Sequence, residues 1–383
     1  MTGRERLIKV LNGEQVDRIP NAPFIFYNII DEYFGKEKAE SMDSERHDLF
    51  YIEKGIELYE RFGFDIILRT ANIFEYLNEI SDENGKWNVQ NVREGNEEEW
   101  TVSTTVSTPE KKLFQKKKYS KVTPHEIVEA ITEYFIKDKD DFDQFVKYQP
   151  PMRQFETKHI AEARKILGDR GLLAPWAQGA FNSASFYRDV ALLVMDPYID
   201  EGFYREVIEY FSDRMFDLIK QLAAAGADIV CCGGNVANGT TAGPDFFTKH
   251  VLPFEKDFTG KVKDLGVRYL YHNCGNAKSL YTVYSSIGMD IFETLTAPPY
   301  ADGDLELAFN TFDSDIVLSG NIDQIDFLVH AKPEDVRKKV KDILTLAKRH
   351  GNFILAASDY FSEGTPEENL RAYAYAALEY GEY

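Results

Sequence analysis

Cysteine is scarce in this sequence, with three residues in 383, two of which are the adjacent Cys231 and Cys232. So small a number cannot form the disulfide framework of a small secreted domain. Long apolar runs are also missing, because no window reaches the ~18 consecutive apolar residues that a membrane helix needs. The first twenty residues lack the apolar stretch of a secretory signal. We therefore predict a cytoplasmic protein with reduced thiols and no membrane partner.

Basic residues are fewer than acidic ones. The sequence has 44 Lys and Arg residues and 64 Asp and Glu residues, which gives a formal net charge of −20. Nucleic acids and anionic membrane surfaces bind proteins through basic patches. The charge balance therefore argues against both as partners. Aromatic side chains, in contrast, make up 14% of the residues, which is enough for a large core and for a pocket with aromatic walls.

The order of apolar segments indicates an α/β fold. Six short strand-like segments alternate with helical ones, at 171–178, 226–234, 267–275, 289–296, 315–323 and 352–359, and two more precede them at 18–28 and 64–71. Eight strands, each mostly followed by a helix, predict a (β/α)₈ TIM barrel. An open doubly wound sheet is the alternative, but it usually carries a glycine-rich turn after its first strand, and residues 18–28 have none.

Two additions to the barrel are predicted. Residues 3–13 place apolar side chains at helical spacing and end at Gly13, which indicates an N-terminal helical extension. Residues 86–121 alternate apolar and polar side chains, which is typical of two or three antiparallel strands inserted over one end of the barrel. No linker divides the chain, so residues 1–383 are predicted to form a single domain.

The C-terminal ends of the predicted strands hold the candidate site residues, since TIM-barrel chemistry collects there. His272 and Cys274 lie at one such end, and residues i and i+2 of a strand point to the same face. Imidazole and thiolate are good zinc ligands, and a catalytic zinc usually has three protein ligands with one open position. Asp359, Glu293 or one of the adjacent cysteines could be the third ligand.

Two other interpretations of the His272–Cys274 pair remain open. The two side chains could simply fill the barrel interior. They could also form a nucleophilic Cys–His dyad. The dyad is disfavoured, because neighbours on one strand stand side by side and are not opposed across a substrate.

Several motifs resemble those of the uroporphyrinogen decarboxylase superfamily, and they occur in the same order along nearly the whole chain. They are RERLIKVLNGEQVDRIP, AGADIVCCGG, YHNCGN, ETLTAPPYADGDLEL, VLSGNID and GNFILAASDYFSEGTPEENLRAYAYAALEYGEY. The H-x-C-G within YHNCGN is the most discriminating of them. The superfamily contains decarboxylases, which hold porphyrinogen carboxylates with N-terminal arginines, and methyltransferases that work with corrinoid proteins. The segment NAPFIFYNII has no arginine, which argues against tetrapyrrole decarboxylation.

The methyltransferase branch shares the H-x-C pair. In its thiol methyltransferases, this pair binds zinc together with a later cysteine near a T-P-x-x-N motif. In this sequence the corresponding position is Asp359, so the resemblance implies a zinc site of His272, Cys274 and Asp359. Replacing a thiolate by a carboxylate makes the bound zinc a harder Lewis acid, which suits an ether oxygen better than an alkyl thiol.

The resemblance and this departure together predict a zinc-dependent methyltransferase. It would move a methyl group between a small methylated substrate, such as a methoxylated aromatic, and a corrinoid. A partner protein would supply the corrinoid, because no D-x-H-x-x-G cobalamin-binding motif is present. Glu293 is predicted to donate a proton to the departing oxygen or to replace Asp359 as ligand. The predicted walls of the substrate pocket are Phe26, Tyr27, Trp176 and Tyr360.

Three alternatives to this function remain. The first is a methylcobamide:thiol methyltransferase of the coenzyme M type. The second is a zinc-free decarboxylase or lyase of the same fold. The third is an inactive barrel that serves as a binding partner of a corrinoid protein.

Overall fold

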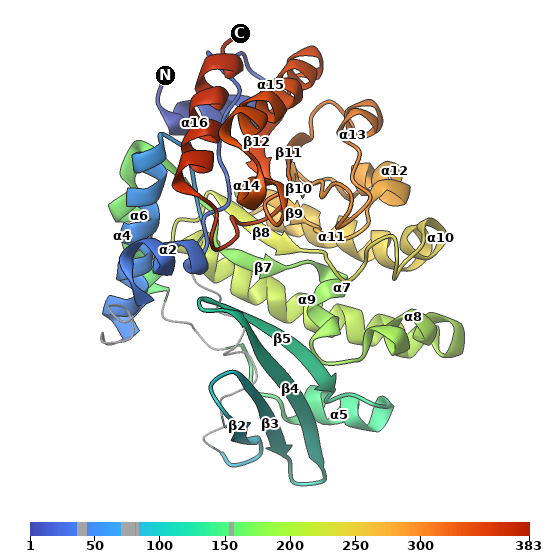
Figure 1. Cartoon of the computed structure of the whole chain (residues 1–383). Helices are drawn as coiled ribbons and strands as arrows, with labels where there is room; N and C mark the ends of the chain where they lie inside the picture. Colours follow the sequence, from blue (N-terminus) through green and yellow to red (C-terminus); the bar gives the residue numbers. More distant parts are fainter. Residues whose placement is uncertain (37–43, 70–80, 82–83, 153–156) are drawn as a thin grey trace.

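The computed structural model describes residues 1–36, 44–69, 81, 84–152 and 157–383. Parallel strands form the centre of the molecule and helices lie around them, while the two chain termini lie close together (Figure 1). Among the helices of these residues, none is both long and apolar enough to cross a membrane.

Six strands form one parallel sheet in the order β12-β11-β10-β9-β8-β7. They are β7 (Trp176–Gln178), β8 (Ile229–Gly233), β9 (Arg268–His272), β10 (Ile291–Thr294), β11 (Val317–Ile322) and β12 (Phe353–Ala357). A separate parallel pair consists of β1 (Ile66–Leu68) and β6 (Gly171–Leu173). The predicted TIM-barrel architecture is confirmed, although the barrel is not closed by one continuous ladder.

The first predicted strand, residues 18–28, is wrong as a regular strand. Pro20 and Pro23 have no N–H to donate, and a central strand cannot form around them. The segment still lies between β12 and β1, because Ala22 N–H donates to Leu355 O at 3.0 Å and Asp65 N–H donates to Asn21 O at 2.8 Å. Phe26 and Tyr27 therefore do not end a strand. They begin helix α2 (Tyr27–Phe34), with Phe26 at the N-cap.

The predicted N-terminal helix is α1 (Gly3–Leu11), which begins at a capping box formed by Thr2 and Glu5. Its apolar face packs against the interior of the barrel, because one cluster of buried side chains joins helix and strands. The cluster includes Leu7, Val10 and Leu11 of α1 with Ile67, Leu172, Ile229, Leu270, Ile291, Val317 and Ile354. All of these strand residues precede the C-terminal ends of their strands. The interior is thus packed at the end nearer α1, and the opposite end remains for chemistry.

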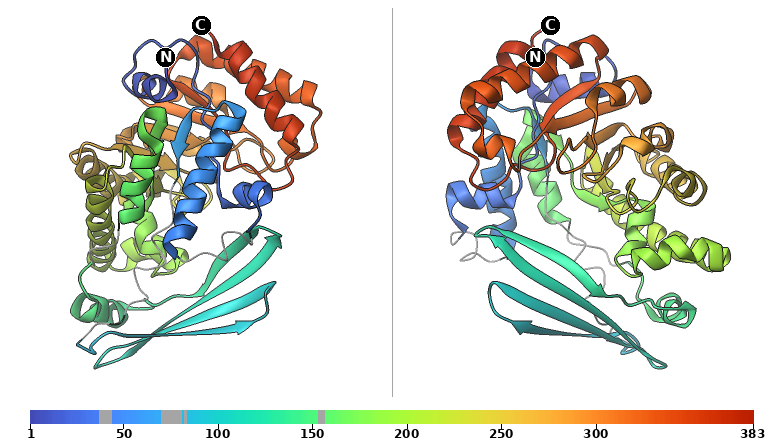
Figure 2. Two further views of the ribbon diagram at one scale, coloured as in Figure 1. Left: turned by 90° about the vertical axis from the view of Figure 1, so that its left-hand side faces the viewer. Right: turned by 45° about the vertical axis from the view of Figure 1, so that its right-hand side comes forward.

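The β-rich insertion is longer than predicted and has four antiparallel strands in the order β2-β3-β4-β5. They are β2 (Asn88–Gly95), β3 (Glu99–Ser107), β4 (Lys112–Thr123) and β5 (Glu126–Glu133). The last strand lies beyond residue 121, and its ladder with β4 joins Lys121 to Ile127 and Lys116 to Glu133. The sheet forms a separate layer beside the barrel (Figure 2).

The helices follow the predicted alternation with some shifts at their ends. Helix α8 (Val190–Ile199) ends directly before Asp200, which caps the long helix α9 (Glu201–Ala224). The predicted strand 64–71 is β1, and its residues 70 and 71 lie outside the described part of the chain. The other α-helices of the described residues are α4 (Ser44–Phe62), α5 (Lys139–Tyr148), α6 (Lys158–Leu167), α7 (Ala180–Ser185), α10 (Pro244–Phe246), α11 (Leu252–Lys263), α12 (Tyr281–Tyr284), α13 (Leu305–Thr311), α14 (Phe327–His330), α15 (Pro333–His350) and α16 (Glu367–Gly381).

Candidate metal centre

His272 is the last residue of β9, and Cys274 follows two positions later. Hydrogen bonds hold the short segment that carries them. Asn273 donates from Nδ2 to Tyr284 Oη at 2.5 Å, and its carbonyl accepts from Thr294 Oγ1 at 2.6 Å. Cys274 N–H donates to Asn235 Oδ1 at 3.2 Å. The buried amide of Asn273 therefore points away from the two flanking side chains and fixes their position.

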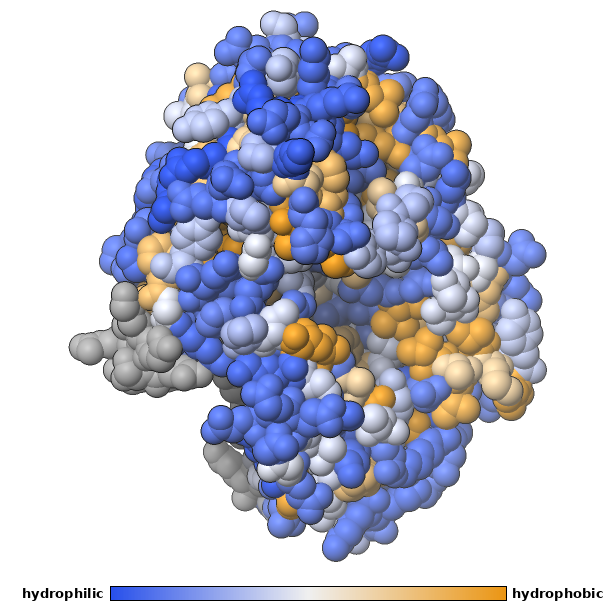
Figure 3. All heavy atoms as spheres, viewed as in Figure 1, coloured by the Kyte–Doolittle hydropathy of each residue, from blue (hydrophilic) through white to orange (hydrophobic). Residues whose placement is uncertain are grey.

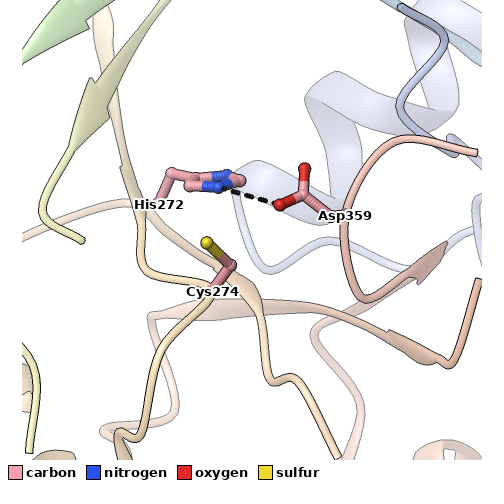
Figure 4. Close-up of side chains that lie close together, drawn as sticks. All are labelled: His272, Cys274 and Asp359. Carbon is pink, nitrogen blue, oxygen red and sulfur yellow. Dashed lines mark ion pairs between the residues drawn. The ribbon is translucent and has the colours of Figure 1, made fainter. Parts of the chain in front are cut away.

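Asp359 comes from a different part of the chain, two residues after the end of β12. Its Oδ2 lies 3.7 Å from His272 Nε2. One nitrogen, one sulfur and one oxygen from His272, Cys274 and Asp359 all lie within 4.8 Å of one another. Figure 4 shows the three side chains pointing toward one another. In the described part of the chain, this is the one group of three such residues that could hold a metal ion.

The donor set of one nitrogen, one sulfur and one oxygen is of a kind that Zn²⁺ accepts. Ligands placed ~2.0–2.3 Å from a tetrahedral zinc ion lie ~3–4 Å from one another. The separation of 3.7 Å between His272 and Asp359 is already in this range. Three protein ligands leave one position open, as in catalytic zinc sites.

Glu293 contacts the opposite edge of the His272 ring, at Nδ1. It lies beside His272 on the adjacent strand β10. Glu293 Oε2 lies 2.8 Å from His272 Nδ1, and Glu293 Oε1 accepts a hydrogen bond from Arg69 Nη2. Both carboxylate oxygens are therefore engaged. Burial would raise the pKa of Glu293, but the charge of Arg69 and the bond to His272 lower it from its ordinary value. Burial likewise opposes the charged form of His272, yet Asp359, Cys274 and Glu293 raise the pKa of this imidazole well above 6.5.

Three of the four predicted pocket residues meet around Phe24, which the sequence had not suggested. The Phe24 ring centroid lies 5.5 Å from that of Phe26, 5.6 Å from that of Trp176 and 5.8 Å from that of Tyr360. Trp176 in turn packs edge-on against His272 at 5.1 Å. Tyr27 is farther out and contacts this cluster through Phe26, at 4.8 Å between the ring centroids.

The two adjacent cysteines are not part of the metal group. Cys231 and Cys232 are fully buried, and burial raises the pKa of Cys231 to about 12. Protonated thiols are poor ligands, because metals bind the thiolate. Cys274 is the cysteine that is not fully buried.

The antiparallel sheet contacts the loop that carries Asp359. Tyr360 Oη donates to Glu126 Oε1, and Glu363 accepts from Thr123 Oγ1 and from His125 N–H. The turn between β4 and β5 is therefore bound to the barrel next to the candidate metal centre. The face of the molecule seen in Figure 3 is hollowed near its centre, and apolar side chains gather along part of the rim.

The fold and this site define a TIM-barrel-type protein with an N/S/O metal group at the C-terminal end of its strands. Residues 120–380 match the uroporphyrinogen decarboxylase (URO-D) family, and the chain belongs to that family. Over 261 residues, 66% of this chain and 71% of the relative, it is 21% identical to the methylcobamide:CoM methyltransferase MtbA of Methanosarcina acetivorans. It is also 26% identical over 173 residues, 44% of each chain, to a methylated-thiol–coenzyme M methyltransferase of Methanosarcina mazei.

A solved structure described as a methyltransferase from Methanosarcina mazei has the same fold, with a TM-score of 0.70 at 16% identity over 99% of both chains. That likeness shows the fold, while the family match and the two sequence relatives support the corrinoid-dependent methyltransferase branch of the superfamily. The prediction made from the H-x-C-G motif is confirmed at this level.

Proposed function

We propose that the protein is a zinc-dependent methyltransferase that moves a methyl group from a methoxylated aromatic compound to a corrinoid. The observation that carries this proposal is the gathering of His272, Cys274 and Asp359 within 4.8 Å at the open end of the barrel. In the reaction the C–O bond of the ether breaks and its electron pair stays on oxygen as a phenolate. The methyl group is taken up by the reduced corrinoid of a partner protein.

His272, Cys274 and Asp359 would hold the metal and leave one position for the substrate oxygen. Zinc bound there would supply a Lewis acid that polarises this oxygen. Asp359 bears on the substrate class, because a carboxylate in place of a second thiolate favours a hard oxygen ligand. The Asp359 side chain is 20% exposed, so the group can be reached from solvent.

The aromatic cluster supports a flat substrate. Phe24 and Trp176 lie on the His272 side, and Tyr360 lies next to Asp359 in sequence, so the rings border the metal group. Aromatic rings bind other rings by edge-to-face and offset contacts. Phe26 also packs against Tyr360, at 5.1 Å between the ring centroids, and Tyr27 extends this surface from Phe26.

The partner protein would dock over the C-terminal end of the strands, where Asp359 and Cys274 are reached. We also infer that residues 1–383 act as one domain, because Tyr360 and Glu363 of the barrel bind Glu126 and Thr123 of the antiparallel sheet. A cytoplasmic location remains part of this proposal.

A thiol acceptor is the second candidate function. It is favoured by the names of the two relatives, both of which are coenzyme M methyltransferases. The two functions differ in whether the atom that enters the open position is oxygen or sulfur. They share the metal group and the corrinoid.

Methyl transfer with purified protein, zinc and free reduced cobalamin separates the candidates. Aryl methyl ethers such as methoxybenzoates would be compared with methylcobalamin plus a small alkyl thiol. Demethylation of the ether supports the first function, and thiol methylation alone replaces it with the second. Turnover of an ether in the absence of any corrinoid would contradict both.

A further inference from the structure

Arg69 was not among the predicted site residues, yet it lies at the centre of the barrel. It follows directly after β1, and its side chain is only 2% exposed. The guanidinium lies over the Phe24 ring, 5.0 Å from its centroid, and 5.7 Å from that of Trp176. Its ion-pair partner among the described residues is Glu293. Burying a cation costs free energy unless the cation is paired, and the ion pair with Glu293 offsets this cost.

The contacts of Glu293 show what the arrangement fixes. One carboxylate oxygen, Oε1, binds Arg69, and the other, Oε2, lies 2.8 Å from His272 Nδ1. With an ionised carboxylate on that side, Nδ1 must carry the proton and donate it. Nε2 is then the ring nitrogen directed to Asp359, at 3.7 Å. The contact with Glu293 therefore fixes the orientation of the ring and holds a proton on Nδ1, so that Nε2 is the nitrogen that can give up its proton to a metal.

We propose that Arg69 is a positioning residue, which anchors Glu293 so that His272 presents Nε2 to the metal. Partners that orient a ligating histidine change metal affinity by about 10–100-fold when they are removed. Each oxygen of Glu293 has a hydrogen-bond partner on the side away from Asp359, so we assign Glu293 the role of orienting His272, in place of the predicted roles of third ligand or proton donor. The consequence for zinc rests on the proposed metal site, whereas the orientation of His272 does not.

Arg188 offers a matched control at a distance from the site. It forms a doubly hydrogen-bonded ion pair with Asp196, at 2.5 and 2.6 Å, and both side chains are 5% exposed. Arg69→Met and Arg188→Met thus each remove a cation from a buried pair. Zinc affinity would be measured by competition with a chromophoric chelator, alongside denaturant unfolding. We expect Arg69→Met to lose about 10–100-fold in zinc affinity, and Arg188→Met to lose stability while keeping wild-type affinity.

Arg69→Lys keeps a charge but lacks the planar fork of the guanidinium. Arg69→Lys is expected to bind zinc with an affinity between those of the wild type and Arg69→Met. If Arg69→Met does not fold, the zinc affinity of Arg69→Lys is the measurement that tests the proposal. Unchanged zinc affinity in a folded Arg69 variant overturns the proposal. So does an equal loss in Arg188→Met, since the effect would then be general destabilisation.

A second readout needs no metal. In ¹⁵N-histidine-labelled apo protein, the Nδ1–H of His272 should give a solvent-protected proton resonance, assigned by its absence in His272→Gln. The resonance should persist in Arg188→Met and be lost in Arg69→Met. If the wild type lacks it, the positioning role is wrong whether or not zinc binds. If the resonance behaves as expected but zinc does not bind, the positioning role stands and the proposed metal site fails.

Discussion

The buried carboxylate of Glu255, on α11, accepts a hydrogen bond from the backbone N–H of Phe181, on α7, at 3.0 Å. Glu255 is 0% exposed, and Tyr269 Oη lies 3.5 Å from its other oxygen. Burial raises the pKa of Glu255 to about 7, although the backbone N–H groups of Phe181 and Ala180 and the Tyr269 hydroxyl oppose the shift. This carboxyl group is therefore uncharged over much of the range in which surface carboxyl groups are ionised.

The raised pKa of Glu255 predicts a specific pH dependence of stability. A group whose pKa is higher in the folded state stabilises the fold fully below its unfolded pKa, and this contribution is lost as the pH rises through the folded value. The window here runs from 4.5 to about 7. The free energy of unfolding should lose up to about 3 kcal/mol across it from this group alone. Urea unfolding at several pH values measures the slope.

Glu255→Gln is the comparison that isolates this group, because an amide retains an acceptor oxygen and cannot ionise. Its unfolding free energy should fall less steeply than that of the wild type between pH 5 and 8. Burial raises the pKa values of the neighbouring Tyr269 and Tyr271 well above 10, so neither phenol titrates in this range. Parallel pH profiles for the two proteins would show that Glu255 is not the group responsible.

A second prediction concerns the bond between Tyr360 and Glu126, which joins the barrel to the antiparallel sheet. Tyr360→Phe should lower the free energy of unfolding by about 1 kcal/mol. In a double-mutant cycle with Glu126→Ala, most of this loss should appear as coupling. The exposed pair Lys118 and Glu99, on the same sheet, is the control and should couple by ~0.5 kcal/mol or less. Equal coupling in both cycles would contradict a specific link at the barrel mouth.

Strands whose residues are buried on both faces could be predicted closely from the sequence. Every residue of β8 and β12 is buried, and each strand appears in the sequence as a short continuous run of apolar residues. Residues 18–28 were misassigned because Pro20 and Pro23 remove ladder donors while tertiary contacts still hold the segment between two strands. The segment EIVEAITE forms strand β5, although Glu and Ala are good helix formers. Its pairing with β4 decides its state instead.

In the site, too, local sequence patterns could be read and contacts between distant segments could not. His272 and Cys274 could be placed on one face by their spacing, and Asp359 followed from a strand end and from the resemblance. Arg69 also follows an apolar strand, so reading the end of that strand could have suggested it. Its partner Glu293, however, is 224 positions away, and the sequence gives no signal for that pairing. Phe24 was passed over for Phe26, because a regular strand was expected there.

The third prediction separates Cys274 from the buried Cys231. Cys274→Ala should remove zinc and methyl transfer together, because it deletes the thiolate of the metal group. Cys231→Ala should leave both largely intact, since Cys231 is fully buried beside Arg69 and outside the group. Zinc content after gel filtration, measured by atomic emission, checks both variants. A full equivalent of zinc in Cys274→Ala would show that the metal binds elsewhere.

The last prediction concerns Asp359, whose oxygen lies 3.7 Å from His272 Nε2. Asp359→Ala should weaken zinc binding at least ~10-fold, because one of three ligands is lost. Asp359→Cys should restore the affinity with a softer donor. If the carboxylate sets the preference for an ether oxygen, the Cys variant should lose ether demethylation and gain activity with a thiol. Chelator competition and the two methyl-transfer assays measure these effects. Wild-type zinc affinity in Asp359→Ala, together with lost methyl transfer, would mean that Asp359 acts on the substrate and is not a ligand.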